Sequence, residues 1–124
     1  MIVYHYTNKA SINSIIRSGR LRPSNPWTSA DAAYGTGWYF TDLSPDTCDM
    51  DVAYYCWRNT YSTRSRVKYY VAYNIPSSLL RTYRKHVYML SRWDSRIRRV
   101  RYGEKPDCGL KPCRNCPDGQ KYGM

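Results

Sequence analysis

One ten-residue segment, residues 66–75, constrains the fold more than any other part of the chain, because its side chains alternate in polarity. The more apolar row consists of Val67, Tyr69, Val71, Tyr73 and Ile75. Such an alternation places every second side chain on the same face of a β-strand, and Pro76 ends the strand because it has no backbone donor. The sequence therefore predicts a strand over residues 66–75, the clearest element of the chain.

Shorter patterns predict the elements around this strand. Isoleucines recur at helical spacing and predict a helix over residues 11–17, with Asn8 or Ser11 as its N-cap and Gly19 at its end. Further elements are expected at residues 3–6 (strand), 20–33 (loop), 35–41 (turn and strand), 45–57 (helix), 87–90 (strand) and 97–102 (exposed edge strand). The order is strand, helix, strand, helix and then three strands, which is typical of an α+β fold.

The 124 residues carry a net charge of +11, and this charge is concentrated in one segment. Residues 58–101 contain twelve Lys and Arg against a single acidic residue, Asp94, whereas residues 1–57 are close to neutral. A basic segment of this kind either faces an anion or serves only solubility. We expect a neutral half that makes a pocket and a basic half that faces a phosphate or an anionic acceptor.

The length and the apolar pattern exclude several classes of protein. The chain is too short for a multidomain protein, and no apolar run reaches the roughly 20 residues that span a bilayer. The first residues lack the basic region and apolar stretch of a signal peptide. We expect a monomer without membrane attachment, with one folded domain over residues 1–106 and a Cys-, Gly- and Pro-rich tail over residues 107–124.

The cysteines leave three alternatives open. The chain has five of them: Cys48, Cys56, Cys108, Cys113 and Cys116. An odd number without a signal peptide argues against a complete disulfide framework. The last three are spaced closely enough to bind zinc, which would need a fourth ligand from Cys48, Cys56 or His86. A single Cys-x-x-Cys is a weak zinc signal, so a disulfide or free thiols are favoured.

Three short features contain residue types that can do chemistry. His5-Tyr6-Thr7 closes the first strand, Gly35-x-Gly37-x-Tyr39-Phe40-x-Asp42 opens the second, and Tyr54-Tyr55-Cys56 lies on the helix that follows. Taken singly, each has an ordinary structural explanation: a polar strand end, a turn and an aromatic in a core. Their order and spacing carry more information than any one of them.

In this order the three features resemble the NAD-binding half of the diphtheria-toxin/poly(ADP-ribose) polymerase class of ADP-ribosyltransferases. Ser18-Gly19-Arg20-Leu21 and Asp42-Leu43-x-Pro45 extend the resemblance, which is nearest to the small toxin-type group named for a His-Tyr-Asp signature. It implies an ADP-ribosyltransferase-like fold, with small mixed or antiparallel sheets and two helices in the N-terminal half. It also implies an enzyme that cleaves NAD, its co-substrate, at the nicotinamide–ribose bond and transfers ADP-ribose to a protein or a nucleic acid.

The resemblance also assigns roles to individual residues. The implied NAD-binding residues are His5, Tyr6, Thr7, Gly37, Tyr39 and Tyr55. Tyr39 and Tyr55 would sandwich the planar nicotinamide ring. His5 would hold a ribose hydroxyl, and the backbone of Tyr6 would hold the carboxamide. Gly37 would allow a tight turn where a side chain would crowd the pocket.

The acidic residue that this class carries late in the chain has no clear counterpart. Alignment of the strands favours His86, residue type favours Asp94, and Glu104 is the third choice. The catalytic candidates are therefore His5, Tyr39, Asp94 and His86. Asp94 has a plain alternative as a solvated partner of Arg92 or Arg96. If the position belongs to His86, we still expect transfer, and only chain elongation should fail.

Other functions compete with a mono-ADP-ribosyltransferase. An NAD glycohydrolase is one alternative. A non-catalytic module that binds NAD or ADP-ribose would account for the missing acid. A basic nucleic-acid-binding domain would account for the interleaved Arg and Tyr of residues 64–70 and 81–84, since Tyr stacks on bases and Arg neutralises phosphates. The compartment stays open between an intracellular protein and a delivered toxin or effector.

Overall fold

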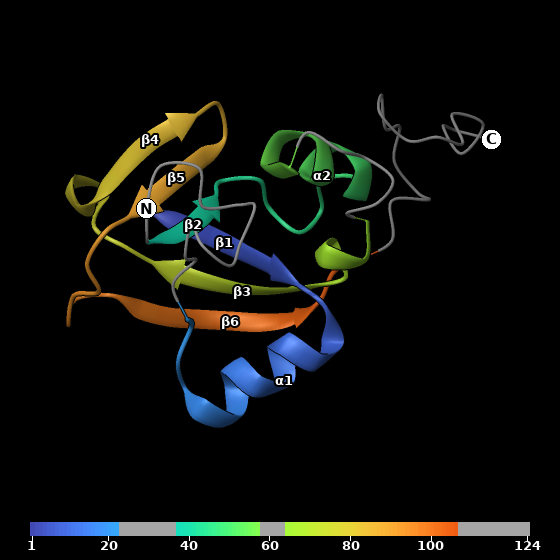
Figure 1. The fold of residues 1–124 in the computed structure, drawn as a ribbon, viewed down its shortest axis with the longest axis horizontal. Coiled ribbons are helices and arrows are strands. Elements are labelled where there is room, and N and C mark those ends of the chain that lie inside the picture. Colours follow the sequence, from blue (N-terminus) through green and yellow to red (C-terminus); the bar gives the residue numbers. More distant parts are fainter. Residues whose placement is uncertain (23–36, 58–63, 107–124) are drawn as a thin grey trace.

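A computed structural model describes residues 1–22, 37–57 and 64–106 (Figure 1). Six strands form one antiparallel sheet in the order β4-β5-β2-β1-β3-β6. The elements are β1 (Ile2–Thr7), α1 (Lys9–Ser18), β2 (Trp38–Thr41), α2 (Asp49–Trp57), η1 (Arg64–Val67), β3 (Tyr69–Asn74), η2 (Ser77–Leu79), β4 (Leu80–Arg84), β5 (Val87–Leu90) and β6 (Arg98–Glu104). The sheet and its two α-helices confirm the predicted α+β class.

The two helices cover opposite faces of the sheet (Figure 1). Ile12 and Ile15 of α1 belong to a buried cluster with Val71 of β3, and Val52 of α2 belongs to a second cluster with Ala72. Val71 and Ala72 are neighbours in β3, so their side chains point to opposite faces. Both faces of this central strand are therefore buried, one under each helix.

β1 and β2 are neighbours in the sheet but are barely paired. β1 pairs with β3 along its whole length, and β2 pairs with β5 along its whole length. Between β1 and β2 the described residues contain a single register pair, Tyr4 opposite Thr41. The sheet is therefore made of two three-stranded halves that meet at this pair. We call the opening between residues 5–7 of β1 and residues 38–40 of β2 the split.

The first predicted helix is confirmed together with its caps. The side chain of Asn8 accepts a 2.8 Å hydrogen bond from the amide of Ser11, so Asn8 is the N-cap. Gly19 adopts a left-handed conformation with φ of 72°, and its amide donates to the carbonyl of Ile15 at 2.8 Å. Glycine adopts this conformation without steric cost, which explains why the helix ends there.

Three expectations about the elements need correction. β3 spans six residues instead of ten, because residues 64–67 form the 3-10 turn η1 before it. α2 begins at Asp49 instead of Pro45, because a turn closed by the Thr47 amide and the Ser44 carbonyl precedes it. The sequence analysis did not predict β4, because its sequence Leu-Arg-Thr-Tyr-Arg has only one strongly apolar side chain. This segment is a strand because it pairs with β5, and the local sequence pattern does not reveal that pairing.

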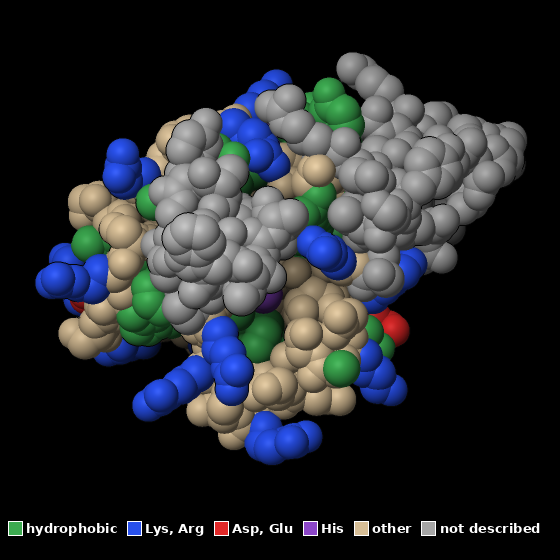
Figure 2. All heavy atoms as spheres, viewed as in Figure 1, with side chains coloured by type: hydrophobic (Ala, Val, Ile, Leu, Met, Phe, Trp, Pro, Cys, Tyr) green, Lys and Arg blue, Asp and Glu red, His purple; other side chains and the backbone are tan. Residues whose placement is uncertain are grey.

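β6 lies at the edge of the sheet, as predicted, and most of it is exposed. It presents Arg98, Arg99 and Arg101 together with the exposed side chains of Val100 and Tyr102. Figure 2 shows Lys and Arg side chains spread over the visible face, with few acidic ones among them. The sheet therefore has a positively charged edge.

The expected loop from residue 23 onward, Gly35 and the tail over residues 107–124 lie outside the described residues. In the part of the chain that the structure describes, neither helix is long and apolar enough to span a membrane.

A buried ion pair ties the start of α2 to the end of β6. Nζ of Lys105 lies 2.6 Å from Oδ1 of Asp49, and the two side chains are 1% and 3% exposed. Lys105 also donates to the carbonyl of Thr47, and Nζ of Lys68 lies 3.4 Å from the other oxygen of Asp49. Asp49 is in the first turn of α2, where a negative charge also favours the helix dipole. These contacts fix α2, and with it Tyr55, against the sheet.

We predict that Lys105→Met destabilises the fold by about 3 kcal/mol, because it leaves the carboxylate of Asp49 buried without its main partner. Urea denaturation followed by far-UV circular dichroism measures the loss. Lys68→Met is the matched control. Since the Lys68 side chain is 47% exposed, its removal should cost less than about 1 kcal/mol. Equal losses in the two variants would contradict this account.

Candidate functional site

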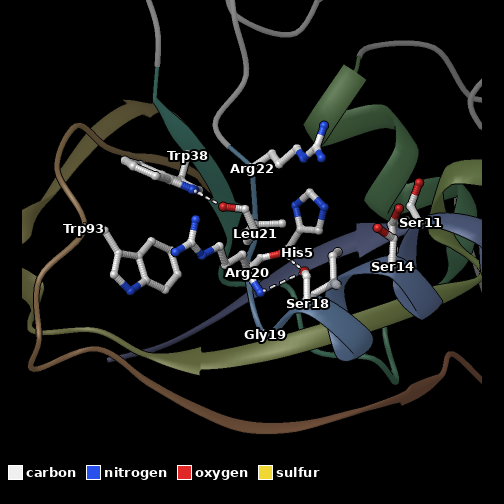
Figure 3. A pocket seen from close by; sticks show the side chains of 12 residues that line it. His5, Ser11, Ser14, Ser18, Gly19, Arg20, Leu21, Arg22, Trp38 and Trp93 are labelled. Atoms are coloured by element: carbon white, nitrogen blue, oxygen red, sulfur yellow. Dashed lines mark hydrogen bonds between the residues drawn. The ribbon is translucent and has the colours of Figure 1, made fainter.

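A cavity of about 1030 Å³ lies beside α1, at one side of the split (Figure 3). Its lining comes from four places: His5 and Thr7 of β1, Ser11, Ser14, Ile15 and Ser18 of α1, residues 19–22, and the rings of Trp38 and Trp93. We call it the α1 cavity. The lining thus joins residues 5–22 with Trp38 and Trp93, which lie far from them in the sequence, so the cavity exists only in the folded chain.

Two tryptophan rings form one wall of the α1 cavity. Nε1 of Trp38 donates a 2.6 Å hydrogen bond to the carbonyl of Leu21, which ties the start of β2 to the segment after α1. The rings of Trp38 and Trp93 lie 5.4 Å apart, and Trp93 packs edge-on against Tyr73 at the same distance. Ring contacts of this kind hold the wall in place.

The α1 cavity combines hydroxyl groups, positive charge and flat rings. Ser11 and Ser14 present hydroxyls from α1, and Arg20 and Arg22 bring two guanidinium groups. Figure 3 shows the imidazole of His5 turned into the same hollow. Guanidinium groups bind phosphates, hydroxyl groups suit a sugar, and indole rings stack on planar heterocycles. This lining fits a nucleotide better than it fits an apolar molecule.

A smaller cavity of about 70 Å³ lies at the same split and also includes His5 in its lining. We call it the tyrosine cavity, since Tyr4, Tyr6, Tyr39 and Tyr83 line it, together with Phe40, Thr41, Cys56, Trp57 and Val87. The rings of Tyr39 and Tyr83 pack edge-on with centroids 5.8 Å apart. The hydroxyl of Tyr6 donates to the carbonyl of Leu43 at 2.6 Å, and burial raises the pKa of this phenol well above its ordinary range.

A third cluster lies where β2 ends and the β4–β5 hairpin turns. Nδ1 of His86 lies 2.7 Å from Oδ1 of Asp42, and the hydroxyl of Tyr88 donates to Oδ2 of Asp42 at 3.0 Å. That hydrogen bond, together with burial and the carboxylate's charge, raises the pKa of Tyr88. The ring of Tyr55 packs edge-on against His86 with centroids 4.7 Å apart. We call these four residues the His86 cluster.

Asp94 and Glu104 make none of the contacts of the His86 cluster. Asp94 accepts hydrogen bonds from the Arg96 guanidinium at 3.0 and 2.9 Å and from the Arg96 amide at 2.8 Å. These bonds lower the pKa of Asp94 to about 2. Glu104 is exposed at the end of β6. Neither carboxylate belongs to the lining of the two cavities, and the pairing with Arg96 is the plain alternative expected for Asp94.

The structure brings some of the expected site residues together and separates others. His5 and Thr7 reach the α1 cavity, while His5, Tyr6 and Tyr39 reach the tyrosine cavity. Tyr55 instead contacts His86, outside the lining of both cavities. The two cavities share His5, which places this residue at the centre of the split.

Several residues of the site are absent from the sequence prediction. They are Ser11, Ser14, Arg20, Arg22, Trp38 and Trp93 at the α1 cavity, and Tyr83 at the tyrosine cavity. The serines carried a usable signal, because Ser11, Ser14 and Ser18 recur at helical spacing and form a hydroxyl stripe. No sequence pattern indicated Trp93, because it comes close to Trp38 only in the folded chain.

Gly37 is constrained by a close approach of β5. A Cβ atom at Gly37 would lie 2.9 Å from the carbonyl oxygen of Leu90 and 3.2 Å from Cγ of Met89. The first contact is with backbone, which cannot turn aside. Gly37 therefore lets β2 lie against β5, a structural need that is separate from its expected role beside the ligand.

The described residues contain no group of three or more His, Cys, Asp or Glu side chains that could hold a metal ion. Cys56 is not part of a disulfide, whereas Cys48 is disulfide-bonded. Cys108, Cys113 and Cys116 lie outside the described residues.

The sequence matches a known protein family. The family model of the HYD1 signature-containing ADP-ribosyltransferases covers residues 3–97, which is most of the folded part of the chain. The protein belongs to this toxin-type ADP-ribosyltransferase family. The matched stretch contains His5, Tyr39, Tyr55 and His86 and ends before Glu104. No match was found among curated proteins or among solved structures.

We predict that Gly37→Ala destabilises the fold by about 1–3 kcal/mol, because the added methyl pushes β2 away from Leu90. Thermal unfolding at matched concentration measures the change. Gly103→Ala is the control, since a Cβ at Gly103 would meet Tyr70 at an ordinary 3.7 Å. That variant should stay within about 0.5 kcal/mol of the parent. A harmless Gly37→Ala would refute the close-approach argument.

Proposed function

We propose that this protein is a mono-ADP-ribosyltransferase that cleaves NAD at the nicotinamide–ribose bond and transfers ADP-ribose to a macromolecular acceptor. One observation carries the proposal. In a chain of the ADP-ribosyltransferase family, His5 lines both the α1 cavity and the tyrosine cavity at the split. A dinucleotide has two chemically different ends, and these two cavities offer two different linings that meet at one residue.

The α1 cavity suits the ADP half of NAD. Arg20 and Arg22 can pair with the pyrophosphate, and the hydroxyls of Ser11 and Ser14 can bond to a ribose. The wall of Trp38 offers a flat surface for adenine. A volume of about 1030 Å³ is at the upper end of what ligand pockets usually have, so the ADP half fits without displacement of the backbone.

The tyrosine cavity suits the nicotinamide end, with Tyr39 against one face of the ring, whereas Tyr55 packs against His86 and leaves the expected sandwich incomplete. At about 70 Å³ this cavity is far smaller than an ordinary ligand pocket. Binding therefore requires the edge-on rings of Tyr39 and Tyr83 to turn apart, and rotamer changes of this size are common when ligands bind. The tyrosines then hold the leaving group flat and keep water from it.

Cleavage passes through a ribose that carries positive charge. The bond from C1 of the ribose to the nicotinamide nitrogen breaks, and its electron pair leaves with nicotinamide. His5 would hold a ribose hydroxyl at the split, with Thr7 beside it, so that C1 faces the acceptor. Orientation of this kind accounts for a large part of the rate of a group transfer.

The positively charged edge of the sheet favours an anionic acceptor. Arg98, Arg99 and Arg101 of β6 are exposed, and this charge raises the local concentration of a polyanion such as a nucleic acid. A nucleic acid is therefore the favoured acceptor, with protein as the second candidate. A basic binder without chemistry is the competing function that the same charge supports.

We predict that His5→Ala lowers the rate of ADP-ribose transfer by about 100-fold, because the ribose loses its orienting contact. Labelled NAD with mixed RNA and protein acceptors measures the transfer. Lys9→Ala, at an exposed position outside both cavities, should keep the parent rate. Nicotinamide release without transfer by the parent would indicate a glycohydrolase. Ligand-induced stabilisation with intact NAD would indicate a binding module.

We also predict that Arg22→Ala raises the KM for NAD about tenfold and leaves kcat almost unchanged, because a phosphate contact persists through the reaction. Steady-state nicotinamide release against NAD concentration separates the two constants. Arg17→Ala removes an exposed arginine of α1 that does not line the cavity and serves as the control. An unchanged KM in Arg22→Ala, or an equal rise in Arg17→Ala, would contradict the placement of the ADP half.

A further inference from the structure

We propose that His86 is the general base that takes the proton from the acceptor during transfer, and that Asp42 is its positioning residue. This inference rests on the proposed function and assigns a further step to it. Its basis is the His86 cluster, where Asp42 from the end of β2, Tyr88 from β5 and Tyr55 from α2 surround one imidazole.

The contacts of Asp42 fix which nitrogen of His86 is available. Oδ1 of Asp42 lies 2.7 Å from Nδ1 of His86, and a carboxylate can only accept, so Nδ1 carries the proton. The Tyr88 hydroxyl donates to the second oxygen at 3.0 Å and holds the carboxylate in place. Nε2 then has its lone pair, and it makes no hydrogen bond to any described residue. An imidazole in this tautomer, backed by a carboxylate, is arranged to accept a proton.

The backbone of His86 supports a functional reason for this residue. His86 sits in the two-residue turn between β4 and β5 with φ of 65°, and it is the only non-glycine residue with positive φ in the described part of the chain. Glycine or asparagine would adopt this conformation more readily. A residue kept at an unfavourable angle is often found where chemistry needs its side chain.

The cluster lies beside the tyrosine cavity and remains open to a large acceptor. Val87, the next residue, lines that cavity together with Tyr39 and Cys56. The side chains of His86 and Asp42 are 29% and 32% exposed. A macromolecule can therefore reach Nε2 from solvent while NAD occupies the split.

Two cations stand near the cluster on the same hairpin. Nζ of Lys85 lies 5.9 Å from the centre of the Tyr55 ring, and the guanidinium of Arg84 donates to the carbonyls of Tyr55 and Cys56. Asp42, Tyr88, Tyr55, Lys85 and Arg84 are thus charged or titratable groups around His86. The cations favour the approach of an anionic acceptor to the base.

The proposed step moves one proton to His86 and one electron pair to nicotinamide. The acceptor's O–H or N–H proton moves to Nε2 of His86 as the acceptor atom bonds to C1 of the ribose. The bond from C1 to nicotinamide breaks, and its electron pair leaves with neutral nicotinamide. His86 is left as an imidazolium paired with the Asp42 carboxylate, and it returns its proton to water. Asp94 is a poor alternative, because its hydrogen bonds to Arg96 hold its pKa at about 2.

The test compares variants of the full chain by ADP-ribose transfer and by NAD binding, between about pH 5 and pH 9. His86→Asn keeps a residue suited to positive φ and should lower transfer about 100-fold with NAD affinity unchanged. Asp42→Asn should lower transfer at least about tenfold, because the amide NH2 of Asn can donate to Nδ1 and so favour the tautomer in which Nε2 carries the proton. The loss should fall on kcat with the KM for NAD unchanged, because Asp42 acts on the base and does not line either cavity. Lys9→Ala, which is exposed and lies outside the His86 cluster and both cavities, is the control and should keep the parent rate.

A second variant separates chemistry from folding. His86→Gly fits the turn without strain and leaves space for free imidazole. Added imidazole should raise the transfer rate of this variant at least about tenfold. A parent-like rate and pH profile in His86→Asn, or no rescue of His86→Gly by imidazole, would overturn the dyad while the proposed function stands. A parent protein that neither transfers ADP-ribose nor releases nicotinamide would overturn both.

Discussion

β1 and β2 meet at one register pair, Tyr4 opposite Thr41. The site exists because the described residues of the two strands do not pair along the rest of their length. Each strand is held firmly on its other side, by β3 and by β5. The unpaired ends therefore form a split with rigid borders, and His5 and the two cavities lie there. The buried contact of Asp49 with Lys105 fixes α2 beside this split. Preorganised borders are what a transfer reaction needs, because they orient the ligand before bond cleavage.

Local patterns in the sequence predicted much of the fold and part of the site. The caps at Asn8 and Gly19, the strand over residues 87–90 and the edge strand at the end follow from local chemistry, and the structure has them. The motifs also directed attention to His5 and Tyr39, and the family match confirms the ADP-ribosyltransferase class behind them. Local chemistry suffices here because each of these features is decided within a few residues.

The rest depends on contacts between distant residues. The hydrogen bond of His86 with Asp42 spans 44 positions, and the ion pair of Lys105 with Asp49 spans 56. The Trp38–Trp93 wall and the split itself depend on strand pairing, which a single sequence leaves undetermined. Sequence also suggested Asp94 through its residue type alone, whereas its contacts tie it to Arg96. The charge and type of a residue such as Asp94 do not predict its function when the side chain that it contacts is unknown.

We propose that NAD lies along the split, with its two ends in two cavities that share His5. A crystal structure of the protein with a non-hydrolysable NAD analogue would show this directly. We expect the pyrophosphate beside Arg20 and Arg22 and the nicotinamide ring against Tyr39, with His5 at the ribose between them. An analogue bound elsewhere on the molecule, or one whose nicotinamide end points away from Tyr39, would refute this placement of NAD.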